Sequence, residues 1–292
     1  TWSTGVGGSH HIRIQNSEIK NSLASTIGIF GDSAAQGSAY ACNFMEILNN
    51  KIHTGGASQL HHGIYGATDN NLVERNEIYD LSGLGVHFFN LHNTSDVHDN
   101  IARYNVIHDN STGGGGGYGI LLASGANNKA YGNIIYGNSG GIQVWFNSVN
   151  GVVYNNTIYA NNAAVGGDCI NIYQSSGCTG TQPTGTVIKD NVCNGNTQGT
   201  SGGKIKDCGA GSVIDHNLCQ SSGSCGTNAV ISASPGFTNA GAHDFSLSST
   251  SSAMYNAGVA ISGFAYNGSA PEVGAYETLP FSAEIGATGN TF

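Results

Sequence analysis

Charged side chains are scarce in this chain of 292 residues. Asp, Glu, Lys and Arg make up 9% of it, against about 25% in an average globular protein. The net charge is −9, and the nine Lys and Arg residues form no basic run that would neutralise nucleic-acid phosphates. We therefore expect no nucleic-acid partner, and a strongly anionic polysaccharide would also find few cations.

Long apolar runs and helical periodicity are missing as well. No apolar segment approaches the roughly 20 residues of a membrane span, so no membrane span is predicted. Only 4 residues are Pro, whereas 45 are Gly. The polar residues are mostly Asn, Ser and Thr, which suit turns and strands better than helices. Because hydrophobic residues still make up 39% of the chain, the composition predicts an all-β protein with a packed core.

Cysteine is concentrated in one part of the chain. The count is seven, so at least one Cys is free or pairs outside the chain. Six lie between Cys169 and Cys225, which places any cross-links in the C-terminal half. Scarce charge, abundant Asn and clustered Cys together favour a secreted protein, extracellular or on the cell surface. No Cys or His spacing matches a standard zinc pattern, so no metal site is predicted.

One short pattern recurs eight times. An aliphatic residue, two spacers, an Asn, one spacer and another small apolar residue follow one another, as in Val153, Asn156 and Ile158. The pattern returns every 23–35 residues, which indicates a solenoid. Its segments are short and rich in β-branched residues, so the coils should consist of parallel strands turned by Asn. The Asn position is occupied by Ser17, Asn50, Asn76, Asn105, Asn133, Asn156, Asn191 and Asn217.

A second strand per coil stands between these Asn positions. It reads GIFGD at 28–32, GIYGA at 63–67, GVHFF at 85–89, GILLA at 119–123, GIQVW at 141–145 and CINIY at 169–173. With the Asn pattern, these strands resemble the right-handed parallel β-helix proteins of the pectate-lyase-like and polygalacturonase-like superfamily. The resemblance covers roughly residues 10–235.

The expected architecture is a right-handed parallel β-helix of about eight coils over residues 1–235. Residues 236–292 should form a C-terminal cap, because PEVGAYE at 271–277 resembles the closing segment of secreted bacterial β-helix proteins. No amphipathic helix precedes the first pattern, so its coil would expose unpaired backbone groups. Either the chain is a processed piece of a longer protein, or self-association covers this N-terminal coil.

In the resembling enzymes, the groove beside the second strand holds the substrate. Alternation points Phe30, Tyr65, His87, Leu121, Gln143 and Asn171 outward, followed two residues later by Asp32, Ala67, Phe89, Ala123, Trp145 and Tyr173. Aromatic rings stack on sugars and amides bind their hydroxyls, although an ordinary solvated strand face would look similar. The predicted polysaccharide-binding residues are His61, Asp32, Phe89, Gln143, Trp145, Asn171 and Tyr173.

Three residues on adjacent coils form the predicted catalytic cluster. His62, Tyr65 and His87 should lie within one sugar's width of one another. A neutral His or Tyr can remove the proton beside a uronate carboxyl group, and a Tyr can protonate the leaving oxygen. This chemistry belongs to β-elimination lyases and epimerases. Such a site also needs Arg, Lys or Ca²⁺ for the carboxylate, and these strands lack Arg and Lys. No cofactor is predicted, with Ca²⁺ as the alternative.

A hydrolase would instead need two carboxylates at one glycosidic bond. GGDCINI at 166–172 is similar to the polygalacturonase strand DDCIAI, with Asp168 at its second Asp. The first Asp of that pair is Gly167 here, and the family's Asn-Thr-Asp motif is absent. Asp168 is therefore a weaker catalytic candidate, with a turn residue as the alternative.

Two further columns leave alternatives open. Cys193 and Cys219 share one inward column and predict either stacked thiols or a disulfide. An outward column on five coils carries only His and Tyr, which suits a glycan-binding stripe, a lateral contact between copies, or simple strand propensity. It consists of His53, Tyr79, His108, Tyr136 and Tyr159.

The sequence supports two functional hypotheses. In the first, the chain is a secreted lyase-like or hydrolase-like enzyme that binds a polysaccharide in the groove. In the second, it is a non-catalytic extracellular fibre or adhesin protein whose open N-terminal coil stacks on a neighbouring subunit. Resemblance of fold is only an associational argument for the enzyme.

Overall fold

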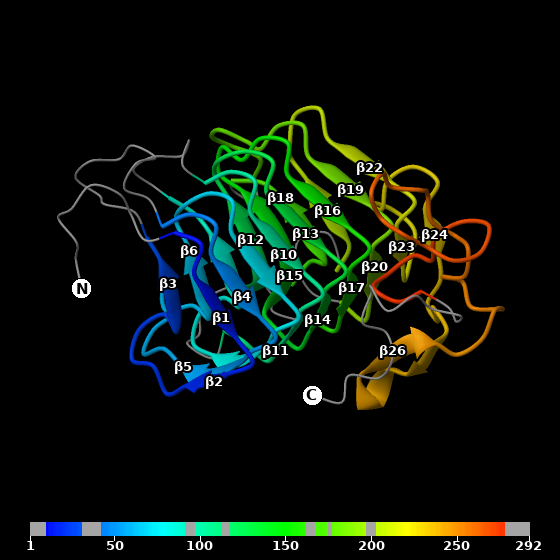
Figure 1. Cartoon of the computed structure of the whole chain (residues 1–292). Coiled ribbons are helices and arrows are strands. Elements are labelled where there is room, and N and C mark those ends of the chain that lie inside the picture. Colours follow the sequence, from blue (N-terminus) through cyan, green and yellow to red (C-terminus); the bar gives the residue numbers. More distant parts are fainter. Residues whose placement is uncertain are drawn as a thin grey trace.

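Three long parallel sheets form the body of the molecule (Figure 1). The computed structural model describes residues 10–30, 42–90, 97–111, 117–161, 167–174, 177–196 and 203–277. Asp32, one of the predicted binding residues, lies outside these ranges. We name the sheets A, B and C. Sheet A contains β1 (Arg13–Gln15), β4 (Glu46–Leu48), β7 (Leu72–Glu74), β10 (Ile101–Arg103), β13 (Lys129–Tyr131), β16 (Val152–Tyr154), β19 (Val187–Lys189) and β22 (Val213–Asp215).

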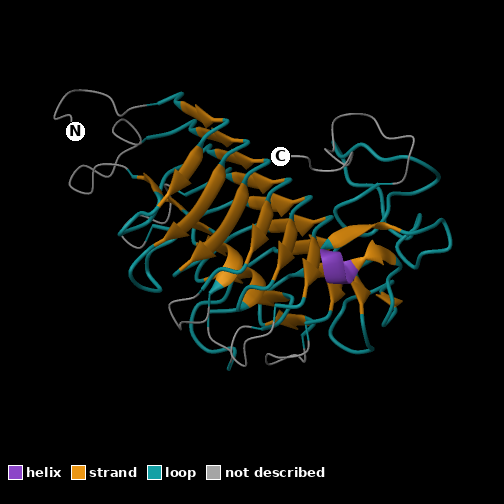
Figure 2. Cartoon of the chain, turned by 90° about the horizontal axis from the view of Figure 1, so that it is seen from below, coloured by secondary structure: helices purple, strands orange, loops and turns teal. Residues whose placement is uncertain are grey.

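The other two sheets stack in the same way, with strands from successive coils side by side (Figure 2). Sheet B contains β2 (Glu18–Lys20), β5 (Lys51–Gly55), β8 (Glu77–Leu81), β11 (Val106–His108), β14 (Ile134–Tyr136), β17 (Thr157–Tyr159), β20 (Val192–Asn194), β23 (Leu218–Cys219) and β24 (Val230–Ile231). Sheet C contains β3 (Ile27–Ile29), β6 (Ile64–Gly66), β9 (Val86–Phe88), β12 (Tyr118–Ala123), β15 (Gly140–Trp145), β18 (Ile170–Ile172) and β21 (Ile205–Asp207).

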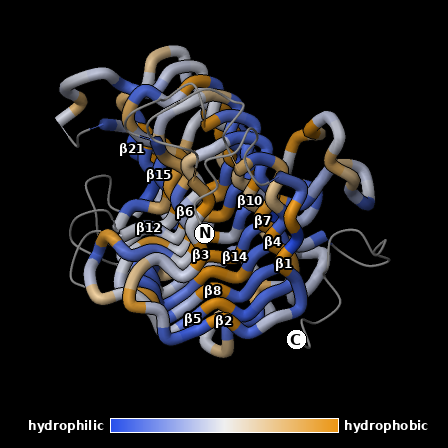
Figure 3. Tube along the Cα trace, turned by 60° about the vertical axis from the view of Figure 1, so that its left-hand side comes forward, coloured by the Kyte–Doolittle hydropathy of each residue, from blue (hydrophilic) through white to orange (hydrophobic). Residues whose placement is uncertain are grey.

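The coils from β1 to β21 therefore have three strands each, one more than the sequence pattern suggested. The repeated Asn lies at a corner between two strands: Asn76, for example, separates β7 from β8. The predicted columns of aliphatic residues are confirmed. Val73 pairs with Ala102, and Ile78 pairs with Ile107 on the next sheet. These side chains are fully buried, and hydrophobic positions recur from coil to coil in Figure 3.

The corner Asn residues form a ladder of buried amides. Asn76 Nδ2 donates to Asn105 Oδ1 at 3.0 Å, and Asn105 Nδ2 donates to Asn133 Oδ1 at 3.0 Å. The residue before each of these positions, such as Tyr104 with φ 57°, adopts the left-handed conformation. The chain bends there, which turns the following amide inward, where its hydrogen bonds are satisfied. Two further ladders link Asn71, Asn100 and Asn128, and Asn110, Asn138, Asn161 and Asn196.

The Gly residues at the start of the sheet C strands are required by close packing. A Cβ atom on Gly85 would lie 2.5 Å from Ile107 Cγ2, and one on Gly119 would lie 2.5 Å from Ile135 Cγ2. Real Cβ contacts are longer, so a larger residue would displace the core column of sheet B. The repeated Gly-Ile and Gly-Val pairs thus bring the corner of sheet C close to sheet B.

The tail after sheet B packs along the side of the coils. β25 (Phe237–Asn239) and β26 (Asp244–Leu247) form an antiparallel pair, joined by the short 3₁₀ helix η3 (Ala240–Ala242). Phe245 is 1% exposed and packs on the outer face of sheet B, and Phe264 packs against Tyr131 and Tyr154 on sheet A. The role of residues 236–292 as a cap over the end of the solenoid stays a prediction.

Three disulfides lie in the C-terminal half, as the sequence predicted. They join Cys169 to Cys193, Cys178 to Cys208 and Cys219 to Cys225. Cys193 and Cys219 are register neighbours, but both alternatives for them were wrong. Cys193 bonds to Cys169 and Cys219 bonds to Cys225, at Cα–Cα distances of 5.5 and 6.2 Å. Cys42 is a free Cys in the described part of the chain.

In the described ranges, no helix is long and apolar enough to cross a membrane.

Candidate functional site

Four of the predicted site residues lie in one row on the outer face of sheet C. Strand register aligns Tyr65 with His87, His87 with Leu121, and then Gln143 with Asn171. The expected position of Phe30 in this row was wrong, because Gly28 pairs with Tyr65. A Cβ atom on Gly28 would clash with the ring of Phe30. The ring thus covers the place that a side chain at position 28 would take.

His62, Tyr65 and His87 come into direct contact, as predicted. His62 lies in the turn before β6, whereas Tyr65 lies in β6 and His87 in β9. The ring centroids of His62 and His87 are 4.7 Å apart, and those of Tyr65 and His87 are 4.9 Å apart. The centroids of His62 and Tyr65 are 5.6 Å apart. Three side chains of types that can transfer protons therefore share one small region of the sheet face.

His62 is held as a neutral imidazole of defined orientation. Its Nδ1 atom accepts a hydrogen bond from the backbone N–H of Leu84 at 3.1 Å. Burial, with a smaller contribution from the charge of His61, lowers the pKa of His62 to about 4. Since Nδ1 accepts, the proton of the neutral ring lies on Nε2. His62 can therefore donate a hydrogen bond through Nε2, while Nδ1 is not free to act as a base.

His87 and Tyr65 complete the cluster with different properties. His87 is 7% exposed, and neither ring nitrogen has a hydrogen-bond partner among the described residues. Burial, followed by the charge of His62, lowers the pKa of His87 well below its ordinary value. Burial raises the pKa of Tyr65, so its phenol stays protonated at neutral pH. Unpartnered buried polar atoms are costly, and a catalytic role is one of the explanations for them.

Phe89 and Trp145 extend the cluster, but His61 does not. The ring of Phe89 stacks on His87 at 5.3 Å and lies 5.6 Å from that of Trp145. Trp145 Nε1 donates to the backbone oxygen of Gln174 at 2.8 Å. His61 Nδ1 accepts from the backbone N–H of Ala57 at 2.9 Å. His61 thus binds its own loop and makes no ring contact with the cluster in the part of the chain that the structure describes.

The remaining predicted binding residues form a buried polar network. Asn171 Nδ2 donates to the hydroxyl of Tyr118 at 2.9 Å, and that hydroxyl lies 3.2 Å from the hydroxyl of Tyr173. Gln143 Nε2 donates to the backbone oxygen of Tyr173 at 3.4 Å. Asn171 is fully buried, and Gln143 is 6% exposed. These groups bind one another, so they support the site from beside it.

Asp168 belongs to the same network. It is fully buried, and its Oδ1 atom accepts from the backbone N–H of Gly203 at 3.3 Å. Burial is the main cause that raises the pKa of both Tyr118 and Tyr173, and the charge of Asp168 adds to it. Sequence reasoning missed Tyr118, because it began this strand at Gly119. The signal was present as an aromatic residue directly before the inward-facing Gly.

The row of His and Tyr on sheet B is a continuous stack. His53 and Tyr79 lie 4.7 Å apart, Tyr79 and His108 lie 4.9 Å apart, and His108 and Tyr136 lie 4.8 Å apart, with nearly parallel rings. Tyr79 and His108 each have a neighbouring ring on both faces, so a sugar could not stack on either of them. The tail covers the later part of the row through Phe245.

No group of three His, Cys, Asp or Glu side chains in the described ranges is arranged to hold a metal ion.

A family model described as the right handed beta helix region matches residues 4–158, just over half of the chain. The chain belongs to the right-handed β-helix family. No curated protein matches its sequence. The family match confirms the predicted right-handed β-helix fold.

Two solved structures are similar to this β-helix. The crystal structure of pectate lyase Pel9A has a TM-score of 0.57 and 16% identity, over 92% of this chain and 66% of that chain. The A-module of the Azotobacter vinelandii mannuronan C-5 epimerase AlgE4 has a TM-score of 0.51 and 16% identity, over 76% of this chain and 58% of that chain. This chain thus spans less than two thirds of the length of either. At this identity, the likeness establishes the fold alone.

Proposed function

We propose that this β-helix acts on a polysaccharide by proton transfer at the outer face of sheet C. The observation that carries the proposal is the contact of His62, Tyr65 and His87, with centroids 4.7–5.6 Å apart. The similar solved structures are named for pectate and mannuronan, both polymers of uronic acids. A lyase and a C-5 epimerase both remove the proton beside a carboxyl group, which suits a cluster of neutral acid–base groups.

Each member of the cluster has a role that follows from its protonation. His62 donates its Nε2 proton as a hydrogen bond to a substrate oxygen, since Nδ1 is occupied by Leu84. His87 is neutral, and both of its ring nitrogens are buried and lack partners among the described residues, so it accepts the proton from carbon when substrate displaces a neighbouring ring. Tyr65, kept protonated by burial, supplies a proton to the leaving oxygen. Such groups contribute roughly 10²–10⁴-fold each to a rate.

The preferred substrate carries few charges. On the outward row of sheet C, the cation that the structure describes is Lys206, which pairs in register with Asn171. A polymer of closely spaced carboxylates would need more cations than this face offers. The proposed substrate is therefore a mixed chain in which a uronate is flanked by neutral sugars. Supply of Ca²⁺ to the carboxylate is the alternative, and it is tested by chelation.

Hydrolysis through Asp168 is the weaker proposal. A glycoside hydrolase uses two carboxyl groups on either side of the bond, and Asp168 is fully buried beside Tyr118 and Tyr173.

We place the protein outside the cell or on its surface. The three disulfides support this location, because such bonds persist in oxidising compartments.

The decisive experiment is incubation with a panel of neutral, mixed and fully uronic polysaccharides, with and without EDTA. Unsaturated ends, new reducing ends and exchange of C5 hydrogen with deuterated water are all measured. Unsaturated ends identify a lyase, exchange without cleavage identifies an epimerase, and reducing ends alone favour hydrolysis. Loss of activity in EDTA, restored by added Ca²⁺, would replace the proposed neutral site by a Ca²⁺-dependent one.

Two substitutions of His62 test its role in particular. In His62→Asn, the amide oxygen can replace Nδ1 as acceptor for Leu84, but the Nε2 donor is lost. In His62→Gln, the amide nitrogen reaches closer to the position of Nε2. We expect His62→Asn to be inactive yet folded, and His62→Gln to keep part of the activity. Equal activity of wild type and both variants would remove His62 from the mechanism.

The non-catalytic alternative rests on a separate observation at the N-terminal end. β1, β2 and β3 are the outermost described strands of their sheets, and Ile14 and Ile19 there are only partly buried. A second copy could pair with these edges. The structural role would be favoured over the enzyme by two results together: no activity on any polysaccharide of the panel, and a molecular mass in sedimentation that rises with protein concentration.

A further inference from the structure

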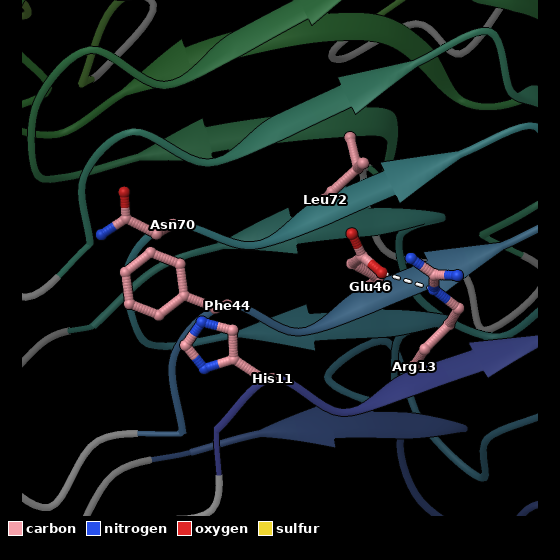
Figure 4. A pocket seen from close by; sticks show the side chains of 6 residues that line it. All are labelled: His11, Arg13, Phe44, Glu46, Asn70 and Leu72. Atoms are coloured by element: carbon pink, nitrogen blue, oxygen red, sulfur yellow. Dashed lines mark hydrogen bonds and ion pairs between the residues drawn. The ribbon is translucent and has the colours of Figure 1, made fainter.

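A depression of about 510 Å³ lies on the outer face of sheet A, on a different sheet from the proton-transfer cluster (Figure 4). Its volume is in the range of small-molecule sites. Three consecutive coils contribute to it in two rows. The turns that lead into β1, β4 and β7 supply His11, Phe44 and Asn70, and the first residues of these strands supply Arg13, Glu46 and Leu72.

His11 and Phe44, in the turns that lead into β1 and β4, have a backbone conformation that ring-bearing residues rarely adopt. His11 and Phe44 both have φ 56°, in the left-handed region. The equivalent residues of the next four coils are Asn or Asp, which tolerate this conformation best among residues with a side chain. They are Asn70, Asp99, Asn127 and Asn150. A bulky Phe is disfavoured there, and residues held in such conformations cluster at functional sites. At this corner of the coil, rings thus occur only in the first two coils, both of which line the depression.

The side chains supply both kinds of contact that a sugar requires. The rings of His11 and Phe44 stack at 4.7 Å, and Phe44 remains 45% exposed. Beside them, Arg13 donates to the carboxylate of Glu46 in an exposed ion pair. Ring and Leu72 carbons fit the C–H surface of a pyranose, while the carboxylate, the guanidinium and the Asn70 amide fit its hydroxyls.

The paired charges of Arg13 and Glu46 favour a neutral sugar over a uronate in this depression. Arg13 is the cation that lines the depression, and its charge is already matched by Glu46. A uronate would have to displace Glu46, whereas a neutral sugar can accept from one partner and donate to the other. We propose that this depression binds a neutral segment of a polysaccharide, separately from the chemistry on sheet C.

The proposal is tested by isothermal titration calorimetry on the full chain. The probes are cellohexaose, xylohexaose and mannohexaose, with hexagalacturonate as the charged comparison. At least one neutral hexamer should bind more tightly than hexagalacturonate. Phe44→Asn places in this coil the residue type of the next one, so the fold should be kept. It should weaken binding by at least about tenfold, and Glu46→Gln should weaken it as well.

Two control variants separate this depression from other parts of the molecule. Tyr104→Asn makes the same change from ring to amide in another left-handed residue, with φ 57°, at the corner between sheets A and B. It should bind as the wild type does. Phe89→Ala removes a ring from the face of sheet C. If no neutral hexamer binds, if Phe44→Asn binds as the wild type does, or if only Phe89→Ala loses binding, the proposal is wrong.

Discussion

The outer faces of sheets B and C both carry His and Tyr on successive coils, yet their rings are arranged differently. On sheet B, His53, Tyr79 and His108 stack face to face, with interplanar angles of 3–5°. Each ring comes from the equivalent position of its strand, so the register of the solenoid alone produces the stack. His53 Nε2 lies 2.9 Å from the carboxylate of Glu18, and His108 Nε2 lies 3.6 Å from that of Glu77, which completes this row.

On sheet C, one residue breaks the stack. His62 stands in the turn before its strand, and its ring meets His87 at 83° and Tyr65 at 87°. This contact buries imidazoles and lowers the pKa of both His62 and His87. The difference teaches that a β-helix aligns aromatic rings by repetition, whereas the proposed catalytic cluster forms where a residue outside the repeat joins them.

The largest expected effect separates the two faces by activity. Tyr65→Phe removes only the hydroxyl of the cluster, and Tyr79→Phe makes the same change in the stack. On the substrate found with the polysaccharide panel, turnover should fall by roughly 10²–10⁴-fold in Tyr65→Phe. Tyr79→Phe should react at the wild-type rate. An equal loss in both variants would show that the two faces do not differ in function.

Removal of Phe245 should expose the sheet B row to solvent. This ring is 1% exposed and contacts Tyr136 and Tyr159. Phe245→Ala should lower the free energy of unfolding by about 3–5 kcal/mol, measured by urea denaturation. Tyr266→Ala, which removes an aromatic residue that is 41% exposed, should change it by less than about 0.5 kcal/mol. A small effect of Phe245→Ala would mean that the tail does not hold the row.

Acidification should destabilise the sheet C face. The pKa of His62 is about 4 in the folded chain, below its ordinary value of 6.5. The unfolded chain therefore binds more protons between these values, so stability rises with pH across this window. The contribution of neutral His62 to the free energy of unfolding is fully present above about pH 6.5 and is lost as pH falls through about 4. It amounts to about 3 kcal/mol for His62, with a change of the same sign for His87.

The measurement is the free energy of unfolding between pH 4 and 8. The His62→Asn variant should have a shallower slope in this window, while His53→Asn, on the stacked face, provides the comparison. A wild-type slope in His62→Asn would show that His62 titrates normally in the folded chain.

The smallest effect concerns a single ring of the stack. Tyr79→Leu keeps an apolar side chain on sheet B but ends the contacts with His53 and His108. Stability should fall by about 1 kcal/mol, measured by thermal unfolding. A loss several times larger would mean that the row is a main source of stability rather than a product of the repeat.

The sequence alone determined the solenoid, its inward columns and the residues of the cluster. These follow from spacing along the chain, because each coil repeats the same inward and outward alternation. Ile78, Ile107 and Ile135 were thus placed correctly without knowledge of any contact. The proximity of Tyr65 and His87 followed from the same alignment.

The tertiary structure decided what depends on contacts between coils. The register that pairs Tyr65 with Gly28, the disulfide between Cys193 and Cys169 and the place of Tyr118 in a buried network all involve residues from separate segments. The orientation of His62 is set by a backbone N–H 22 residues away. Spacing predicts which positions face outward, but only packing decides which of them are buried, and burial sets the protonation on which the chemistry depends.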